Sequence, residues 1–383
     1  MRGALPSFLE PSPQPSITSI VVKLASRCNL ACDYCYWFRD RTVLHSPKVL
    51  SEDLEAAFVR RVESHLRRHG LRRFTIIFHG GEPLLFGKPR FARLCHALRA
   101  AEPRTTTSLD LQVTTNGVLV DEEWAALFRH FRVGVALSID GTAQTHDRHR
   151  RDLRGRPTHA RVVDGLAHLR AFGIEPGILA VADPGSDPGE LLNELVNVHD
   201  CLSLDVLVPD ATHDDDRLPI APYFVKLFDL WYDGYAGRGV HVRLFDAIIR
   251  GLCGFWSGVE SIGRGPTVGA TLCTDGKLEA HDVVRIAGDG STASSLNILT
   301  NEIDELESDP LWRELYAAST NLPQTCRNCE FYHACGGGHI ASRWSSARRF
   351  DNPSSYCEDW KIILAHVWSR IATTLTYEVS QSA

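Results

Sequence analysis

The chain has 383 residues, of which 44% are apolar and 23% charged, a composition typical of a globular protein with a sizeable core. Its formal net charge of -6 disfavours nonspecific binding to nucleic acid. No apolar run reaches the roughly 18 residues of a membrane span, and the proline-rich start MRGALPSFLEPSPQPS lacks the apolar core of a signal peptide. We therefore expect a cytoplasmic protein without a nucleic-acid or membrane partner. Metal binding, rather than a disulfide framework, is the leading explanation for its eleven cysteines.

Short apolar runs alternate with longer amphipathic ones over the first 236 residues. The apolar runs predict strands at Ser19–Leu24, Phe74–Phe78, Leu109–Thr114, Val133–Ile139, Ile174–Val181 and Leu204–Val208. Helical spacing is clear at Ser51–Arg68, which opens on a serine cap, and at Asp121–His130. Six strand-helix repeats predict an α/β protein with a parallel sheet, either an open doubly wound sheet or a partial barrel, with its chemistry at the carboxyl ends of the strands.

The alternation ends after about Gly237. From there to about Asn352 the sequence looks irregular, except that TLCTDGKLEA predicts a hairpin turning at Asp275 and Gly276, and a helix is expected from about Glu358. We therefore expect three parts: a proline-rich tail over residues 1–18, a strand-helix domain over 19–236 and a smaller, loop-rich domain over 237–383.

Three cysteines follow the first predicted strand in the stretch SRCNLACDYCYW. Cys28, Cys32 and Cys35 have the spacing CxxxCxxC on one loop, where their sulfur atoms can converge. A structural zinc ion takes four protein ligands and a cubane cluster has four irons, so three thiolates leave one position open. The alternative, cysteines packed as small apolar residues, does not explain why they cluster in a polar loop.

The pattern CxxxCx(aromatic)C after a first strand resembles the hallmark of the radical S-adenosylmethionine (SAM) superfamily, with Tyr34 in the aromatic position. This resemblance implies a partial (β/α)6 radical SAM barrel with a 4Fe-4S cluster on the three cysteines and SAM on the fourth iron. It also implies that an electron from a small donor such as flavodoxin or ferredoxin cleaves SAM to a 5'-deoxyadenosyl radical.

Other segments resemble the SAM-contacting segments of that superfamily. In HGGEP, Gly80 and Gly81 would let the backbone approach the SAM amino group, and Glu82 would help orient it. The remaining expected SAM contacts are Asn116 in TTNG, Ser138 and Asp140 in SIDG, and Arg150 and Thr158 in the arginine-rich run from Arg148 to Arg161. Asn116 and Asp140 could equally be turn residues, and the arginine-rich run could be a solvated loop rather than a contact for the SAM carboxylate or an acidic peptide.

Four further cysteines lie near the C-terminus: Cys326, Cys329, Cys335 and Cys357. Four thiolates close a site, and on chemistry alone zinc and a 4Fe-4S cluster both fit. The pattern resembles the SPASM extension of radical SAM peptide maturases, which implies iron and sulfur. His339 stands where that family has another cysteine, so we expect one auxiliary 4Fe-4S cluster here.

The remaining cysteines have no such pattern. We interpret Cys253 and Cys273 as packed thiols, with remnants of a cluster or ligands of a partial site with His339 as alternatives. Cys95 and Cys201 are in helical patterns and are expected in the core.

The strings TDGKLEAHDVVRIAG, VLVPDATHDD and CGGGH together with FDNPSSYC resemble the FxsB group of cyclophane-forming peptide maturases. The resemblance implies that a β-hydrogen is abstracted from a ribosomally made precursor peptide and that the carbon is joined to an aromatic side chain. The aromatic ring must then lose an electron and a proton. The auxiliary cluster is a candidate acceptor for the electron, and a base is needed for the proton. His281 and Asp282 are the candidate bases, with a surface pair as the alternative, and Asp210 and His213 are further candidates.

Three other functions stay open at this point. The nearest is a radical SAM maturase that forms formylglycine or a thioether, which would differ in product mass. RNA modification is disfavoured by the net charge. A metal-stabilised peptide-binding module without catalysis would be excluded by SAM cleavage. Because only about 18 residues precede the first strand, a leader peptide is expected to dock on the barrel or on the C-terminal domain.

Overall fold

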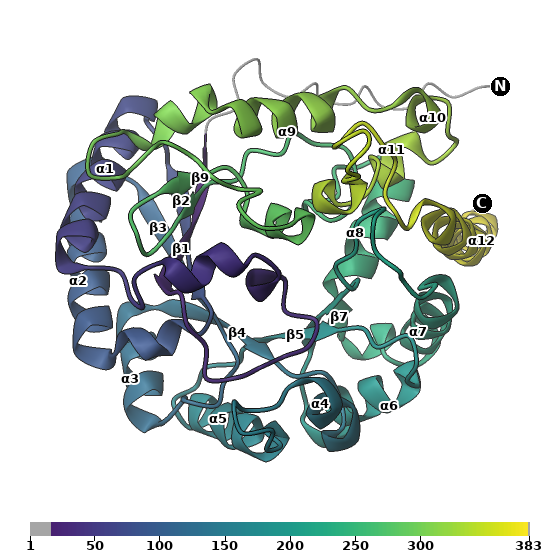
Figure 1. The fold of residues 1–383 in the computed structure, drawn as a ribbon. Helices are drawn as coiled ribbons and strands as arrows, with labels where there is room; N and C mark the ends of the chain where they lie inside the picture. Colours follow the sequence, from purple (N-terminus) through teal and green to yellow (C-terminus); the bar gives the residue numbers. More distant parts are fainter. Residues whose placement is uncertain (1–16, 382–383) are drawn as a thin grey trace. The chain divides into compact units, whose positions relative to one another are not determined.

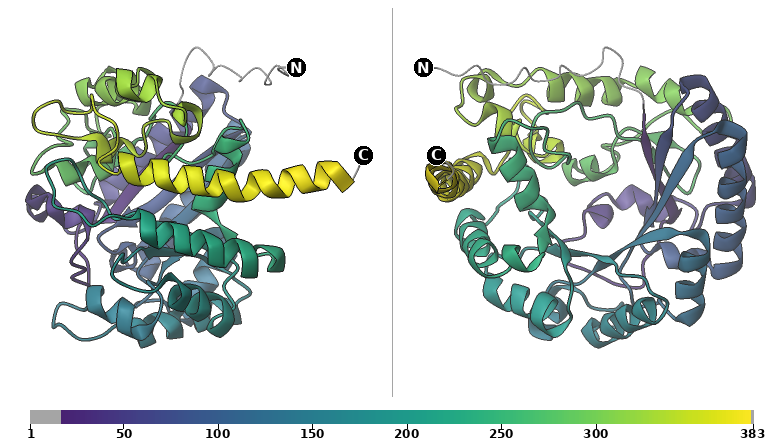
Figure 2. Two further views of the ribbon diagram at one scale, coloured as in Figure 1. Left: turned by 90° about the vertical axis from the view of Figure 1, so that its right-hand side faces the viewer. Right: turned by 180° about the vertical axis from the view of Figure 1, so that it is seen from behind.

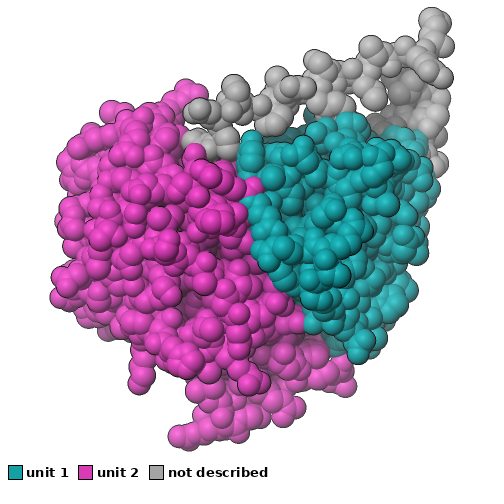
Figure 3. Space-filling view, turned by 45° about the horizontal axis from the view of Figure 1, so that its top comes forward, with its two compact units in different colours: residues 1–15, 181–267, 314–383 teal, residues 16–180, 268–313 magenta. Residues whose placement is uncertain are grey.

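The computed structural model describes residues 17–381, so nearly all of the expected proline-rich tail lies outside the described part of the chain. The chain divides into two compact units, which Figure 3 colours separately. The triad unit contains Ser16–Ala180 together with Val268–Arg313, and the helical unit contains Val181–Thr267 and the residues from Glu314 on. Each unit therefore combines two stretches of chain, whereas the division expected at residue 237 is contiguous.

A parallel sheet forms the centre of the triad unit (Figure 1). Its strands are β1 (Ser19–Ala25), β2 (Arg73–Gly80), β3 (Ser108–Thr115), β4 (Val133–Ser138), β5 (Gly177–Val181), β8 (Thr271–Leu272) and β9 (Leu278–Glu279). Their order is β5-β4-β3-β2-β1-β8-β9, and only β8 and β9 pair antiparallel. The first four predicted strands and the predicted hairpin are confirmed, while β5 begins three residues later than expected.

Helices lie along the outside of these strands (Figure 1). They are α1 (Glu52–His69), α2 (Lys88–Thr105), α3 (Glu122–Phe131), α4 (Ala143–His149) and α5 (His159–Ala171). The predicted cap of α1 is confirmed, because the Ser51 hydroxyl accepts a hydrogen bond from the backbone of Leu54. An aromatic core joins sheet and helices: Phe91 of α2 lies edge-on to Phe78 of β2, at 5.2 Å between ring centroids, and to Trp124 of α3, at 5.3 Å.

Short 3-10 helices occupy much of the connecting chain in the triad unit. These are η1 (Tyr36–Arg39), η2 (Arg41–His45), η3 (Pro83–Phe86), η6 (Asp282–Ala287) and η7 (Ile303–Ser308). The helix η1 begins directly after Cys35, and η3 begins at the proline of the HGGEP motif, so they continue the segments that carry the cysteine triad and that motif.

The helical unit contains the parallel pair β6 (Ser203–Leu207) and β7 (His241–Val242). Its helices are α6 (Pro188–Leu192), η4 (Asn193–Val198), α7 (Ala221–Gly234), η5 (Ala236–Arg238), α8 (Arg243–Leu252), α10 (Gln324–Arg327), α11 (Tyr332–Cys335), η8 (Ile340–Arg343) and α12 (Cys357–Gln381), while α9 (Pro310–Thr320) belongs partly to each unit along the chain. Figure 2 shows α12 beside α7, where His366 Nε2 and Asp229 Oδ1 are 2.8 Å apart. The expectation of an irregular region from Gly237 to Asn352 is wrong, because α8 and α9 lie within it.

No helix among residues 17–381 is long and apolar enough to cross a membrane.

Candidate active site

The cysteine triad lies on the loop that follows β1. The loop is held at its start, where the indole nitrogen of Trp37 donates to the carbonyl of Ser26 at 3.2 Å. The thiols of Cys28, Cys32 and Cys35 are each half-buried, and the Cys35 amide donates to the Cys32 carbonyl at 3.3 Å. The loop therefore presents three sulfur atoms from one short, folded segment, as its spacing predicts.

The chemistry of these three thiols fits a 4Fe-4S cluster. Burial, with smaller contributions from the charges of Glu82, Cys32 and Cys35, raises the pKa of Cys28 to about 12. Burial also raises the pKa of Cys32, to about 11, and that of Cys35. Three neighbouring, half-buried thiolates thus need a cationic partner, which iron supplies, and thiolate sulfur is the donor that such clusters take. We expect Cys28, Cys32 and Cys35 to hold the cluster that binds SAM.

The HGGEP turn packs directly against the cysteine loop. A Cβ atom at Gly80, where φ is +147°, would lie 2.1 Å from the carbonyl oxygen of Ala25, and one at Gly81 would lie 2.4 Å from that of Arg27. The amides of Gly81 and Glu82 donate to those same two carbonyls, each at 2.9 Å. The glycines are therefore required for contact between two segments of the protein, and their contact with SAM stays a prediction.

Glu82 ties the end of β2 to the end of β3. Its fully buried carboxylate accepts hydrogen bonds from Leu84 N at 3.0 Å, Thr115 Oγ1 at 2.7 Å and Asn116 N at 2.9 Å. Burial nevertheless raises the pKa of Glu82 to about 7. The contacts show Glu82 positioning the TTNG loop, and its orientation of SAM stays a prediction.

Asn116 bridges this loop to the triad. Its Nδ2 atom donates to Asn29 Oδ1 at 2.8 Å and lies 3.6 Å from Cys28 Sγ, while its Oδ1 atom accepts from the amide of Val118 at 3.1 Å. Asn116 is thus both a turn residue and a hydrogen-bond donor to an expected cluster ligand, a position from which a side chain tunes a metal centre.

Tyr34, Asp140 and Arg150 form a buried network beside the same loop. Arg150 binds Asp140 through two nitrogens, at 2.8 and 3.1 Å, and the Tyr34 hydroxyl donates to the same carboxylate. Burial would raise the pKa of Asp140, but the charge of Arg150 outweighs it and the pKa is lowered. The solvated-loop interpretation of the arginine-rich run is therefore wrong for Arg150, which is 7% exposed, and right for its neighbours Arg148 and Arg151.

Two further predicted SAM contacts lie close to this network in the chain. Ser138 ends β4 and is buried. Thr158 precedes α5 and donates from its hydroxyl to the carbonyl of Arg150 at 2.7 Å, so it fixes the segment that presents the guanidinium. Both stay predictions as SAM contacts.

A buried lysine that the sequence analysis did not select lies at the centre of a second cluster. Lys23 of β1 stands opposite His79 of β2 in the sheet and is 0% exposed. Its ammonium group donates to Asp282 and to the Tyr36 hydroxyl at 3.0 Å, and Nζ lies 3.2 Å from His79 Nδ1. Tyr36 in turn donates to Asp282 at 2.6 Å. Since His281 and Asp282 are both buried, the surface-pair alternative is wrong.

The electrostatics of this cluster bear on the proposed catalytic base. Burial would raise the pKa of Asp282, but the charge of Lys23 outweighs it and holds the pKa well below its usual value. Burial and Lys23 together lower the pKa of His79 to about 3. A general base works best when its pKa is near the ambient pH, so a carboxylate paired with Lys23 is a weak one. The role of Asp282 or His281 as the base stays a prediction.

Replacing Lys23 by methionine should destabilise the protein by about 3–5 kcal/mol, because the change leaves a buried carboxylate without its cation. In the wild type, the lowered pKa of Asp282 contributes stability that is present above its unfolded value of 3.8 and is lost as the pH falls through the folded value. In the variant, burial alone raises this pKa, so the loss should be largest near neutral pH and shrink in acid. Denaturant unfolding of the reconstituted protein at several pH values measures both effects.

The matched control removes both charges. The double variant Lys23→Met with Asp282→Asn should recover most of the lost stability, because no unpaired charge remains. A single variant as stable as the double one would contradict a strong buried ion pair.

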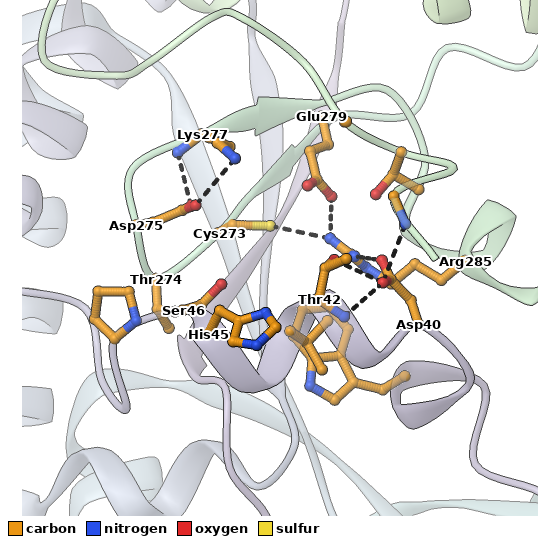
Figure 4. Close-up of a pocket in the computed structure, with 16 residues that line it drawn as sticks. Asp40, Thr42, His45, Ser46, Cys273, Thr274, Asp275, Lys277, Glu279 and Arg285 are labelled. Carbon is orange, nitrogen blue, oxygen red and sulfur yellow. Dashed lines mark hydrogen bonds and ion pairs between the residues drawn. The ribbon is translucent and has the colours of Figure 1, made fainter. Parts of the chain in front are cut away.

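A cavity of about 310 Å³ lies in the same unit (Figure 4). At its wall, Arg285 of η6 donates to both Asp40 and Glu279, and its guanidinium lies 4.5 Å from the centre of the Trp37 ring. Cys273 is buried there, as expected of a packed thiol, with its sulfur 3.5 Å from Arg285 Nη2. The sequence analysis missed this network, whose charges come from segments far apart in the chain.

The second cysteine set lies in the helical unit. Cys326 is in α10, Cys335 ends α11 and Cys357 begins α12, with Cys329 between the first two helices. Burial, with smaller contributions from the charges of the other three thiols, raises the pKa of Cys335 to about 12. Four thiols that are close enough to affect one another's pKa fit a metal site in which the protein supplies every ligand. We therefore expect these residues to hold the auxiliary cluster.

Other predicted residues of the helical unit have structural contacts. His339 caps η8, where its carbonyl accepts from Ser342 N at 3.1 Å. His213 donates to Trp344 O through its amide and contacts Pro353 O through its ring at 2.8 Å, whereas Asp210 is exposed.

Two of the remaining cysteines differ from the prediction. Cys253 is exposed, so its interpretation as a packed thiol is wrong. Cys95 and Cys201 are buried as expected, but Cys201 lies in the loop before β6 rather than in a helix.

Known proteins that are similar to this chain point to the same kind of cysteine site. Residues 22–195 match the family model described as the radical SAM superfamily. The chain is 23% identical to a cysteine-type anaerobic sulfatase-maturating enzyme of Clostridium novyi, over 94% of this chain and 99% of that protein. It is also 23% identical to a serine-type anaerobic sulfatase-maturating enzyme of Bacteroides thetaiotaomicron, over 91% and 88% of the two chains.

A solved structure of native anSMEcpe with bound AdoMet and the Kp18Cys peptide has the same fold. Its TM-score is 0.82 at 23% identity, and the match covers 94% of this chain and 99% of that one. The match confirms the expected α/β fold with a parallel sheet. The family match and the cysteine triad therefore agree over residues 22–195, in a chain that shares its fold with a structure named for its bound AdoMet.

Proposed function

We propose that the protein is a maturase that removes a hydrogen atom from the β-carbon of a side chain in a peptide or protein substrate. The observation that carries this proposal is the similarity, over more than nine-tenths of the chain, to enzymes named for sulfatase maturation. A structure of the same fold holds AdoMet together with a peptide. When bound, the 4Fe-4S cluster and SAM supply a carbon radical strong enough to take hydrogen from an unactivated carbon.

Formylglycine formation at a cysteine or serine is the reaction that these relatives favour. It removes two electrons and two protons from the side chain in all. The 5'-deoxyadenosyl radical takes one of each as a hydrogen atom, so the second electron needs another acceptor. A serine side chain then becomes the aldehyde directly, whereas a cysteine side chain becomes a thioaldehyde, which water converts to the aldehyde with release of hydrogen sulfide. The cysteines at 326, 329, 335 and 357 are the proposed ligands of that acceptor. The electron that starts the reaction would come from flavodoxin or ferredoxin.

The residues of the triad unit have distinct proposed roles. Cys28, Cys32 and Cys35 bind the cluster, and Asn116 donates toward one of its ligands. The network of Tyr34, Asp140 and Arg150 keeps the loop rigid. Lys23 holds Asp282 as a carboxylate, so Asp282 is suited to accept hydrogen bonds from a substrate and to stabilise positive charge nearby.

A carbon-carbon crosslink to an aromatic residue is the second candidate. It is favoured by the resemblance of TDGKLEAHDVVRIAG to cyclophane-forming enzymes and by His339 in the place of a cysteine. Both candidates begin with loss of a β-hydrogen, and they differ in what the carbon becomes.

The product decides between these two reactions. Anaerobic incubation with SAM, a reductant and a cysteine-containing sulfatase-type peptide should replace the cysteine sulfur by oxygen and give an aldehyde that reacts with a hydrazide. The measurement is mass spectrometry before and after hydrazide treatment, with the Cys32→Ala enzyme as control.

A different outcome would favour the second candidate. If a precursor peptide encoded beside the enzyme lost about two hydrogens without hydrazide reactivity, and fragmentation placed a bond between a β-carbon and an arene, crosslinking would replace formylglycine formation. A link through sulfur would contradict both.

A further inference from the structure

Two histidines and one aspartate converge at the end of α1, outside the candidate active site. His65 and His69 are one helical turn apart, so their side chains share a face of α1. Asp304 of η7 lies against that face. One nitrogen of each imidazole and one carboxylate oxygen all lie within 4.8 Å of one another.

The contacts of His65 leave one of its ring nitrogens available to bind a metal ion. It is 0% exposed, and its Nε2 atom lies 2.8 Å from the carbonyl oxygen of Ile17, which can only accept. Nε2 therefore carries the hydrogen, and the lone pair is on Nδ1. This Nδ1 atom is buried and has no hydrogen-bond partner among the described residues. Metal-binding histidines typically donate their other N–H to a carbonyl or carboxylate in this way.

The other two groups face solvent in part. The side chains of His69 and Asp304 are 27% and 19% exposed, and His69 Nε2 lies 3.5 Å from Asp304 Oδ2. Water can therefore reach the site. Arg68 occupies the same carboxylate with hydrogen bonds of 2.9 and 2.7 Å, so it competes with any cation.

The local charge offsets this competition. Besides Asp304, the segment carries the acidic residues Glu302, Glu305 and Glu307. The basic side chains that pair with it from α1 are Arg61, which binds Glu302, and Arg68. The acidic groups thus outnumber the two arginines, which favours a cation at this position.

We propose that His65, His69 and Asp304 form a site for one divalent transition-metal ion, with Zn²⁺ the best fit and water as the fourth ligand. Two imidazole nitrogens and a carboxylate oxygen are a donor set that Zn²⁺ takes at about 2.0–2.2 Å. Tetrahedral ligand atoms at that distance from the metal are about 3.3 Å apart. The ligand atoms of His69 and Asp304 must therefore move closer to His65, which is held in place by its hydrogen bond.

The consequence of such a site is structural. It would join α1 to η7, in the segment that also carries β8, β9 and η6, where Arg61 already donates to the carbonyls of Ile298 and Leu299 at 3.4 and 3.3 Å. The site includes no residue of the cysteine triad, and its existence does not depend on the reaction that the enzyme catalyses.

The test compares zinc bound by the complete protein and its variants. Protein reconstituted with iron and sulfide is treated with EDTA and dialysed anaerobically against micromolar Zn²⁺, and zinc and iron are counted by mass spectrometry. The wild type should bind one zinc more per chain than His69→Gln or Asp304→Asn, with equal iron and equal SAM cleavage. Arg68→Gln should bind zinc more tightly than the wild type, because it removes the competing cation.

Thermal unfolding supplies a second measurement. Added Zn²⁺ should raise the midpoint of the wild type and of Arg67→Gln, an exposed neighbour on α1, but not that of His69→Gln. Equal zinc in the wild type and His69→Gln would overturn the proposal, and so would a wild type that binds none.

Discussion

Replacement of Cys32 by alanine is expected to abolish the cleavage of SAM to 5'-deoxyadenosine. Each remaining thiolate of the triad would hold one iron, and a cubane bound by only two protein ligands has two open corners and is readily lost. The measurement is chromatography of 5'-deoxyadenosine after anaerobic reduction, with iron counted in the same sample.

The structure offers a matched control for this loss. Cys253 is also a cysteine but is exposed and lies outside both proposed sites, so Cys253→Ala should keep wild-type cleavage. Undiminished cleavage in Cys32→Ala would remove the triad from the catalytic centre.

The sequence predicts the sheet well because its signals are local. The strands from Ser19 to Ser138 are apolar runs bounded by turns, and the CxxxCxxC loop follows the first of them, so both could be located without knowledge of distant contacts. α8 was missed because its apolar residues span only ten positions in a glycine-rich region.

The charged networks are harder to predict, since their partners are far apart in the chain. Lys23 and Asp282 are separated by 259 positions, and Arg285 and Asp40 by 245. A signal did exist for Lys23: a lysine within the apolar strand SIVVKLA must pair with a buried anion, because an isolated buried ammonium group is too costly. The sequence alone does not say which anion that is.

Arg150 is a second case in which the sequence alone does not identify the partners of an ion pair. A run of arginines is usually a solvated surface, and most of this run is exposed. The one buried member is selected by Asp140 at the end of β4, and only the fold brings that carboxylate within 2.8 Å of its guanidinium. The charge pattern therefore predicts a basic loop but not which arginine serves the site.

Replacement of Cys357 by serine is expected to remove about half of the iron from the reconstituted protein. Two cubanes give about eight irons per chain, and loss of one ligand of the second cluster should leave about four. Cleavage of SAM should continue, because the triad lies in the other unit and keeps its ligands. Formation of the peptide product should fail, since the proposed electron acceptor is missing.

Stability should change together with the iron. Cys357 begins α12, whereas Cys326 and Cys335 lie in α10 and α11, so a cluster would fasten three helices. Because metal binding stabilises the folded state that holds the ligands, the variant should show faster hydrogen exchange in these helices and not in β1–β4.

The iron count of the wild type and of Cys253→Ala tests whether the protein holds a third cluster. Equal counts near eight would mean that the cysteine is not a ligand and that His339 marks the loss of one cluster. A count near twelve in the wild type that falls in Cys253→Ala would instead mean that a third cluster survives with other ligands. If Cys357→Ser lost the second cluster and still converted the peptide, electrons would have to leave the substrate by another route. The role of the cysteines at 326, 329, 335 and 357 would then be structural, since fastening the helices would be the only function left to them.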